Sequence, residues 1–404
     1  MSNEPPSHTT LQPEAAGSAY IPFNLPFLTG KELAYIEQAV RNGHISGNGT
    51  FTKACHDFFR KEYGFERCLL TSSCTDALEM CALLLDIQPG DEVILPAYTF
   101  VSTANAFALR GARLKFADSS SKSPNIDPMQ VERLMTPRTR AIVVVHYGGI
   151  ACDLERLMAI SQEHGVPLIE DAAHAIDSFF LTSNLPPRPL GSFGSLATFS
   201  FHETKNIICG EGGMLVVNDP LLWRRAEILW EKGTDRASFA RGEVRKYQWV
   251  DLGSSFLPSD IIAAFLLSQL QSLRHIQDTR VDHWQKYRQG LARLADEGHI
   301  EIPEIPSYAT VNGHLFTIVT KELAERDRLI KFLEAHRIQA LFHYLPLNES
   351  PYFTANNSST LLPQAHRYAE CLLRLPLFYK LRDEQIAQIC DAIVKFYDGE
   401  FGAC

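Results

Sequence analysis

The chain lacks the features that mark several broad protein classes. None of its apolar runs is long enough to span a membrane. Its first 18 residues, MSNEPPSHTTLQPEAAGS, contain neither a basic region nor an apolar stretch, so no secretory signal is predicted. Acidic residues outnumber basic ones by 47 to 38, giving a net charge of −9, whereas nucleic-acid-binding domains usually carry a basic surplus. We therefore expect no membrane and no nucleic acid among the partners.

Cysteine is present, but its distribution lacks any pattern of pairing. The nine cysteines are scattered along the chain, their number is odd, and no two of them form a C-x-x-C pair. This distribution is typical of reduced, buried thiols in a cytosolic protein, and it argues against a disulfide framework or a zinc site. We expect a cytoplasmic protein without a bound metal.

What the chain does contain is an ordinary globular composition, with 45% hydrophobic and 21% charged residues in 404. Its length predicts two or three domains, or one large domain with a smaller one. Residues 1–20 are rich in Pro, Ser and Thr and are predicted to form a flexible tail. We assign residues 21–275 to a large domain and 276–404 to a small α+β domain.

Seven short apolar runs alternate with amphipathic stretches in the large domain, and they are predicted strands: 67–71, 92–96, 113–117, 141–145, 166–170, 196–201 and 213–217. Apolar strands separated by helices indicate a mostly parallel α/β sheet covered on both faces. The connection between the last two strands is too short for a helical crossover, so this pair should be antiparallel or non-adjacent. Ligands of such sheets bind at the carboxyl ends of the strands.

One lysine stands in that short connection, within SFHETKNIICGEGG (200–213). Most lysines are solvated surface residues. Here Gly210, Gly212 and Gly213 follow, which indicates close backbone approach or positive φ. A lysine held there and partly desolvated has a lowered pKa, which a lysine acting as a covalent catalyst requires. Lys205 is therefore the first candidate for a catalytic residue.

Two further strand ends carry polar groups. Ser73, Cys74 and Thr75 follow the first strand and open a helix, whose N-terminus could bind a phosphate or could simply be capped by these side chains. Asp171 follows the fifth strand, where a buried carboxylate needs a partner. It could instead be the N-cap of a helix, and His174 could be a packing residue.

A third strand end carries Tyr98 and Phe100, which could belong to the core or stack on a flat ring. Pyridoxal phosphate uses all of these features together: a phosphate cradle, an aromatic face, a carboxylate at the pyridine nitrogen and a covalently linked lysine. The combination is far more specific than any of its members.

The motifs IPFNLPFLTGKEL, GDEVILPAYTFVSTANA, IEDAAHA, SFHETKNIICGEGG and LPLFYKL carry a family resemblance. From about Ile21 to its C-terminus the chain resembles the DegT/DnrJ/EryC1/StrS sugar aminotransferases. The resemblance implies a fold type I transferase dependent on pyridoxal 5′-phosphate, with a seven-stranded sheet. It also implies a homodimer with active sites at the subunit interface. Relatives that are sugar 3-dehydratases have histidine at the lysine position, so Lys205 argues against that reaction.

Carried over residue by residue, the resemblance implies that Lys205 links to the cofactor and moves the proton. Asp171 would face the pyridine nitrogen, and His174 would lie beside the ring and its phenolic oxygen. Phe100 would stack on the ring. Ser200 would hold the phosphate.

The phosphate would also be held by the backbone at the start of the helix, that is by Ser73, Cys74 and Thr75. The run DLGSSF places Ser254 and Ser255 where many relatives have a Gly-Tyr-Asn run that reaches the neighbouring subunit's phosphate, so this contact passes to serine or is lost. Cys209 is expected to be a packing residue.

The closer matches LLDIQPGDEVILPAYTFVSTANAFALRGA, FSFHETKN, EKGTDR and DLGSS imply the particular reaction. An amino group would pass from L-glutamate to C4 of dTDP-4-keto-6-deoxy-D-glucose, giving dTDP-4-amino-4,6-dideoxy-D-galactose for cell-surface polysaccharide. Alternatives are another nucleotide-linked keto-sugar, with a C3 or gluco-configured C4 product, or a non-enzymatic regulatory protein with this fold. Candidate partners of the diphosphate are Lys232, Arg236, Arg241 and Lys246. In HYLPLNESP, Asn348 replaces a frequent family histidine, which leaves the substrate contacts of this loop open.

Overall fold

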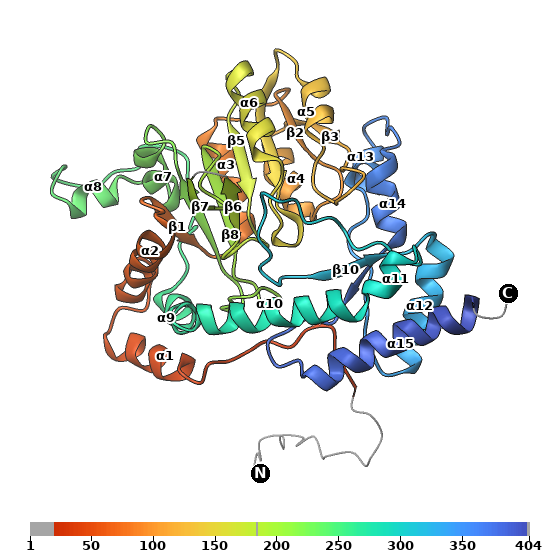
Figure 1. Ribbon diagram of the computed structural model, residues 1–404. Coiled ribbons are helices and arrows are strands. Elements are labelled where there is room, and N and C mark those ends of the chain that lie inside the picture. Colours follow the sequence, from red (N-terminus) through yellow and green to blue (C-terminus); the bar gives the residue numbers. More distant parts are fainter. Residues whose placement is uncertain (1–19, 183–184, 402–404) are drawn as a thin grey trace, which may run out of the picture.

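A seven-stranded sheet forms the centre of the molecule (Figure 1). The computed structural model describes residues 20–182 and 185–401, so the predicted tail lies outside the described residues except for its last residue. In sheet order the strands are β1 (Cys68–Thr71), β9 (Gly213–Val217), β8 (Leu196–Ser200), β5 (Leu168–Asp171), β4 (Thr139–Val145), β2 (Glu92–Pro96) and β3 (Arg113–Ala117). All seven predicted strands are confirmed, with ends that differ by up to two residues.

The sheet is parallel except for β9, which pairs antiparallel with β1 on one side and β8 on the other. The expectation of a mostly parallel sheet is therefore confirmed, as is the antiparallel geometry across the lysine connection. One detail differs from the expectation. Asp171 is the last residue of β5, and residues 172–178 form turns, so the alternative that Asp171 caps a helix is wrong.

Helices cover both faces of the sheet because successive strand residues point to opposite sides. Val93 and Leu95 of β2 pack into the cluster that includes α3 (Cys74–Leu84), α4 (Val101–Ala108) and α7 (Trp223–Trp230), whereas Ile94 packs into the opposite one. The helices on that opposite side are α2 (Thr50–Tyr63), α5 (Pro128–Leu134), α6 (Leu154–His164) and α9 (Asp260–Leu270), with α1 (Glu32–Arg41) packed on α9. The result is a three-layer α/β/α arrangement.

A second hydrophobic cluster lies beyond α10 (Leu273–Gly290), the long helix that crosses below the sheet in Figure 1. It contains the hairpin of β10 (Phe316–Val319) and β11 (Leu372–Leu375) and three helices, α11 (Ala292–Asp296), α12 (Leu323–Ala335) and α15 (Asp383–Phe401). Two shorter helices, α13 (Pro351–Thr354) and α14 (Pro363–Cys371), precede β11, and α14 packs in a separate cluster with Tyr98 and Tyr147. Ile276 packs in the cluster that contains Ile94, on one face of the sheet, whereas Trp284 packs in the cluster beyond α10. We propose that the domain boundary falls inside α10, between these two residues.

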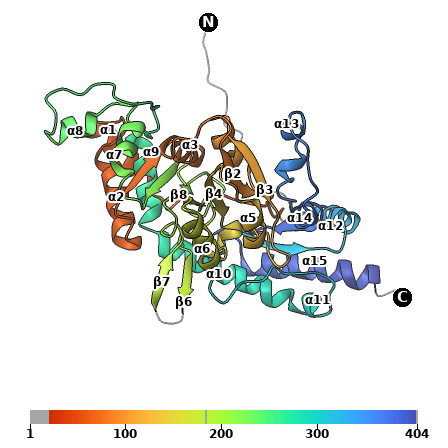
Figure 2. The same cartoon turned by 90° about the horizontal axis from the view of Figure 1, so that it is seen from above.

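Two segments stand away from the body of the molecule in Figure 2. One is the hairpin of β6 (Phe179–Thr182) and β7 (Leu185–Pro189), and the other contains α8 (Arg236–Ala240). The segment after α8 exposes apolar side chains, above all Trp249 with 79% of its surface accessible. Among the described helices, none combines the length and the apolar character that a membrane crossing would need.

Candidate active site

The carboxyl ends of the parallel strands bring the predicted residues to one edge of the sheet. Strands β5 and β8 are neighbours, and they end at Asp171 and Ser200. Strand β1 leads into the start of α3 on the far side of β9. Residues far apart in the sequence therefore meet at the edge where ligands of such sheets bind.

Lys205 lies in a loop that closes on itself beyond β8 and β9. Backbone hydrogen bonds run from Phe201 N to Gly212 O (2.8 Å) and from Cys209 N to Phe201 O (2.8 Å). Gly210 has φ of 85°, which confirms the predicted need for a glycine with positive φ. The chain therefore presents Lys205 from a fixed loop and not from a mobile turn.

The neighbouring residue fixes the loop to the rest of the protein. Asn206 is buried; its side-chain nitrogen donates to Gln277 Oε1 (2.8 Å) and Asn312 O (2.9 Å), and its oxygen lies 2.8 Å from His314 Nδ1. These partners come from α10 and from the chain leading to β10. Asn206 thereby fixes the lysine loop to α10 and to the segment that precedes β10.

Burial lowers the pKa of Lys205 to about 8, although Cys74 and Asp171 act in the opposite direction. In the described part of the chain the ammonium has no hydrogen-bond or ion-pair partner. A desolvated, unpartnered amine is easier to deprotonate, as the sequence predicted. Such an amine can act as a nucleophile and as a proton carrier.

Asp171 is buried, with 4% of its surface accessible. One carboxylate oxygen accepts a hydrogen bond from Thr103 Oγ1 (2.8 Å), and the other accepts from Ala173 N (3.1 Å). Burial raises the pKa of Asp171 more than these bonds and Lys205 lower it. The carboxylate therefore keeps acceptor capacity for a further cationic donor.

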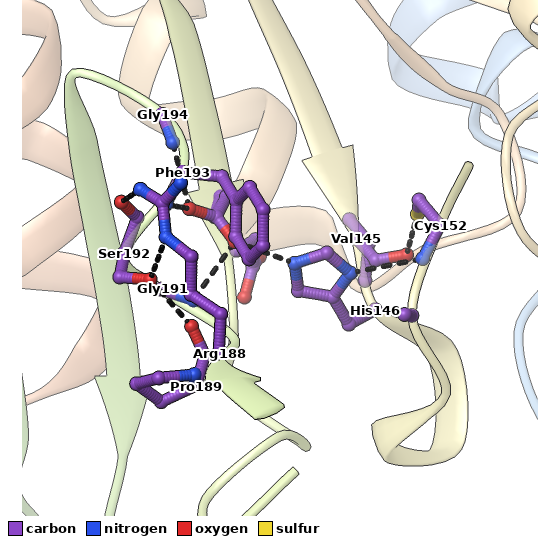
Figure 3. A network of polar contacts seen from close by, with 12 residues as sticks. Val145, His146, Cys152, Arg188, Pro189, Gly191, Ser192, Phe193 and Gly194 are labelled. Carbon is purple, nitrogen blue, oxygen red and sulfur yellow. Dashed lines mark hydrogen bonds and ion pairs between the residues drawn. The ribbon is translucent and has the colours of Figure 1, made fainter. Parts of the chain in front are cut away.

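Glu170, the residue before it on β5, points to the other side of the sheet because strand residues alternate, and Figure 3 labels the four residues that donate to it, His146, Gly191, Phe193 and Gly194. Its oxygens accept from the backbone N–H groups of Gly191 (2.8 Å), Phe193 (2.6 Å) and Gly194 (2.8 Å). His146 Nε2 lies 3.0 Å away and is the fourth donor. Because His146 Nδ1 accepts from Cys152 N (3.2 Å), the ring is neutral and its single proton lies on Nε2.

The start of α3 combines capping with close packing. Ser73 is the N-cap, with its Oγ accepting from Asp76 N (3.0 Å), so the capping interpretation of this side chain is confirmed. Thr75 Oγ1 donates to Ser102 Oγ (2.8 Å). A Cβ on Gly213 would lie 2.4 Å from Cys74 N, which confirms the predicted close backbone approach in the glycine cluster. The first-turn N–H groups of α3 other than that of Asp76 still point out of the helix end.

Beside this helix start, β8 contributes two hydroxyl groups. Ser200 is buried at the strand end, and its Oγ accepts from His202 N at 3.4 Å. Thr198 Oγ1 is buried without a hydrogen-bond partner among the described residues. An unsatisfied buried hydroxyl is costly, so this edge of the sheet is suited to a polar ligand.

His174 forms part of an aromatic cluster with Tyr147, His314 and His343. Its Nδ1 accepts from Gly148 N (3.2 Å), which places its proton on Nε2, and the Tyr344 hydroxyl lies 3.4 Å from that nitrogen. Tyr147 Oη lies 2.6 Å from His343 Nδ1. Burial holds the pKa of His174 well below its usual range, with Lys205 adding to the effect. His174 is therefore a neutral hydrogen-bonding residue.

The remaining predicted residues lie at the margins. Phe100 caps α4, with 56% of its surface accessible and its ring 6.3 Å from that of Tyr344. Tyr98 is fully buried in the aromatic cluster, so its interpretation as a core residue is confirmed. Ser255 is exposed. Arg241 pairs with Glu227 and Glu243, which favours a surface role for it.

Asn348 is buried and donates to Thr360 O (2.8 Å) and Ser359 Oγ (3.3 Å), so its amide nitrogen faces a loop of its own domain. Other residues at the site were not found from the sequence. Thr103 and Asn206 stand inside the quoted motifs TANA and ETKN, but nothing in a single sequence showed which partners they would meet. His343 and Tyr344 begin the stretch HYLPLNESP, which also contains Asn348, and nothing in the sequence indicated their partners either.

Comparison with known proteins defines the class. Residues 26–394 match the model of the DegT/DnrJ/EryC1/StrS aminotransferase family. The spore coat polysaccharide biosynthesis protein SpsC of Bacillus subtilis is 30% identical over 388 residues, covering 93% of this chain and 96% of SpsC.

Solved structures of aminotransferases have the same fold as this chain. The aminotransferase TlmJ of Streptoalloteichus hindustanus has a TM-score of 0.85 at 30% identity, covering 94% of this chain and 99% of TlmJ. The putative sugar aminotransferase Spr1654 of Streptococcus pneumoniae, in its PLP form, has a TM-score of 0.85 at 25% identity, covering 94% and 99%. The chain belongs to the DegT/DnrJ/EryC1/StrS aminotransferase family, and it is a sugar aminotransferase that depends on pyridoxal phosphate.

The residues present at the sheet edge fit this cofactor. The unpartnered Lys205 amine suits its aldehyde, and the spare acceptor capacity of Asp171 suits its ring nitrogen. The orphaned hydroxyl of Thr198 and the free N–H groups of α3 are donors for its phosphate. Lys205, Asp171, Ser200 and the start of α3 are the residues that would hold it.

Proposed function

We propose that the protein transfers an amino group from L-glutamate to C4 of dTDP-4-keto-6-deoxy-D-glucose and releases dTDP-4-amino-4,6-dideoxy-D-galactose. The observation that supports the chemistry is the unpartnered, buried amine of Lys205 close enough to Asp171 for each to shift the other's pKa. The sugar rests on the motif resemblance alone. We place the reaction in the cytoplasm, because every described cysteine is a free thiol.

The cofactor, when bound, supplies an aldehyde that condenses with amines and a ring that delocalises the electron pair left by proton removal. Lys205 moves that proton in our proposal. A pKa of about 8 leaves roughly a tenth of the side chains neutral at pH 7, compared with well under a thousandth at the ordinary value of 10.5. Lys205 can therefore take a proton from the donor carbon and return it to a neighbouring one.

The other residues would position the cofactor and adjust the charge state of its ring. The carboxylate of Asp171, held by Thr103 and Ala173, would keep the ring nitrogen protonated. The neutral His174, whose proton lies on Nε2, would donate one hydrogen bond beside the ring without adding charge. Phe100 would stack on the ring, and Ser73, Cys74, Thr75 and Ser200 would bind the phosphate.

We further propose a homodimer with shared active sites. Phe100 and Trp249 are strongly exposed apolar side chains, and Ser255 lies exposed on the segment that follows α8. A second copy that covers this segment would bury the apolar residues and could bring Ser255 to the neighbouring phosphate. The diphosphate of the sugar would then meet Lys232, Arg236 or Lys246, which are exposed before α8, on it and after it, respectively.

The experiment is a product analysis. The enzyme is loaded with L-glutamate, mixed with a panel of nucleotide keto-sugars, and its products are identified by NMR. A galacto product has an axial amine at C4 and small couplings between H3, H4 and H5. Large couplings would replace it with the gluco product, and an amine at C3 would overturn the regiochemistry. Absence of turnover with every keto-sugar would overturn the assignment of nucleotide-sugar substrates.

A further inference from the structure

One cation near the cofactor edge has no counter-ion and no role in the mechanism above. Arg374 lies on β11, opposite Thr317 of β10, and is partly buried. Its Nε and Nη2 both donate to Phe342 O, at 3.3 and 2.9 Å, and its guanidinium lies 4.6 Å from the centre of the Phe23 ring. Within residues 20–182 and 185–401 it pairs with no carboxylate.

The two residues that contact the Arg374 guanidinium, Phe342 and Phe23, are each next in sequence to residues that lie at the site. Phe342 precedes His343 and Tyr344, and the Tyr344 hydroxyl lies 3.4 Å from His174 Nε2. On the other side, Phe23 precedes Asn24, whose side-chain nitrogen donates to Glu203 O (3.4 Å) in the lysine loop. The guanidinium is therefore held between two segments, one of which contacts His174 and the other the loop that carries Lys205.

The hydrogen bonds of Arg374 differ from those of Arg280, the other buried or partly buried arginine in this region. Arg280 is buried and its guanidinium donates to the carbonyls of Gly313, His314 and Leu377, so its role is to hold backbone. Arg374 uses two of its five N–H groups on a single carbonyl oxygen and keeps the others. Its charge also contributes to lowering the pKa of Lys205 and of His174, so both groups lie within the electrostatic reach of Arg374.

We propose that Arg374 binds the α-carboxylate of the amino-acid donor. This rests on the proposed function, because it presupposes an α-amino acid that reacts at Lys205. The α-carboxylate is bonded directly to the carbon that loses the proton, so it must lie within a few ångströms of the Lys205 amine. The diphosphate of a nucleotide sugar is attached across the ring from C4 and lies farther away. A guanidinium matches a carboxylate with two parallel hydrogen bonds.

The test compares Arg374→Gln, Arg374→Lys and the control Arg133→Gln, a change at an exposed position on α5. Each cofactor-loaded protein is titrated with L-glutamate and with L-isoglutamine, which has a neutral amide in place of the α-carboxylate, and the visible absorbance is followed. Binding of dTDP is measured by calorimetry, and Tm reports folding.

For Arg374→Gln we expect the glutamate concentration at half-conversion to rise about 10- to 100-fold, the loss of one charge-assisted hydrogen-bonded pair. The preference for glutamate over isoglutamine should shrink by a similar factor, with dTDP affinity and Tm close to wild type. For Arg374→Lys the glutamate concentration at half-conversion should lie between the values of wild type and Arg374→Gln, because lysine keeps the charge but cannot donate two parallel hydrogen bonds. The control should match wild type.

An unchanged preference for glutamate over isoglutamine overturns the proposal, whether or not the variant is less stable, because a merely structural role does not move that ratio. Weaker dTDP binding with unchanged glutamate titration assigns Arg374 to the diphosphate instead. Failure of the proposed function looks different: wild type reacts with glutamate but accepts no nucleotide keto-sugar, and the ratio still decides on Arg374. If wild type ignores glutamate, the donor assignment and this inference both fall.

Discussion

Two adjacent carboxylates on β5, Glu170 and Asp171, have the same burial and opposite electrostatics. Burial raises the pKa of both, yet the net pKa of Glu170 is lowered because hydrogen bonds from His146, Gly194 and Gly191 outweigh it. Asp171 has two donors, and its net pKa is raised. Strand alternation sends the two side chains to different environments. The number of donors then separates a saturated structural anion from one with capacity left for a ligand.

The largest loss of activity is expected from a change at Lys205, which lies near Asp171 and not near Glu170. Lys205→Ala removes the amine that faces Asp171, and with it both covalent attachment and proton transfer. Turnover should fall below detection, measured as product formed from glutamate and keto-sugar by a folded variant with normal Tm. Full transamination by Lys205→Ala would show that the site is not at this sheet edge.

Asp171→Asn should keep the fold and lose about 100-fold or more in kcat, because a neutral amide cannot stabilise a protonated ring nitrogen in a buried site. The measurement is kcat at full cofactor occupancy, read from the visible absorbance. A kcat within a few-fold of wild type at full occupancy would contradict the assigned role.

Glu170→Gln is the matched change on the other side of the strand. It replaces an acceptor oxygen by an NH2 group facing N–H donors, so the free energy of unfolding should fall by about 2–3 kcal/mol, with kcat of the folded variant nearly unchanged. Because the folded-state pKa lies below the ordinary 4.5, the carboxylate stabilises above that pH, and its contribution disappears as pH falls through the folded-state value. Urea unfolding at pH 7 and at the lowest pH that the fold tolerates checks both points. A kcat loss as large as that of Asp171→Asn would erase the distinction between the two residues.

The buried ammonium of Lys205 should destabilise the folded, cofactor-free protein. Its folded-state pKa of about 8 lies below the unfolded value near 10.5, so burying the ammonium costs stability below pH 8, and stability is regained as pH rises from 8 to 10.5. Lys205→Met should therefore stabilise the cofactor-free protein at pH 7 by about 1–3 kcal/mol. The gain should vanish near pH 10.5 in urea unfolding experiments. A gain that is independent of pH would mean that packing and not charge is responsible.

The smallest effect is expected at Cys209, four residues after Lys205. Its thiol is buried, and burial raises its pKa well above the ordinary value, so it is not a nucleophile. Cys209→Ser should keep cofactor content and kcat, with a loss of unfolding free energy of about 1 kcal/mol from burying a hydroxyl. Loss of transamination at normal cofactor content would be the contrary result.

The sequence by itself determined the seven strands, the antiparallel pair around Lys205 and the glycine geometry of that loop, because these depend on local apolar runs and on backbone sterics. It also carried the family motifs, and with them Lys205 and Asp171. Only the tertiary structure decided which neighbour each polar group meets. Ser73 proved to be an N-cap, and Asp171 proved to end a strand followed by turns. His343 and Tyr344 entered the site from a segment more than 130 residues beyond Lys205. Hydrogen-bond partners and burial, which set the pKa of Glu170 and Asp171 in opposite directions, arise from long-range packing, and no local pattern in a single chain encodes them.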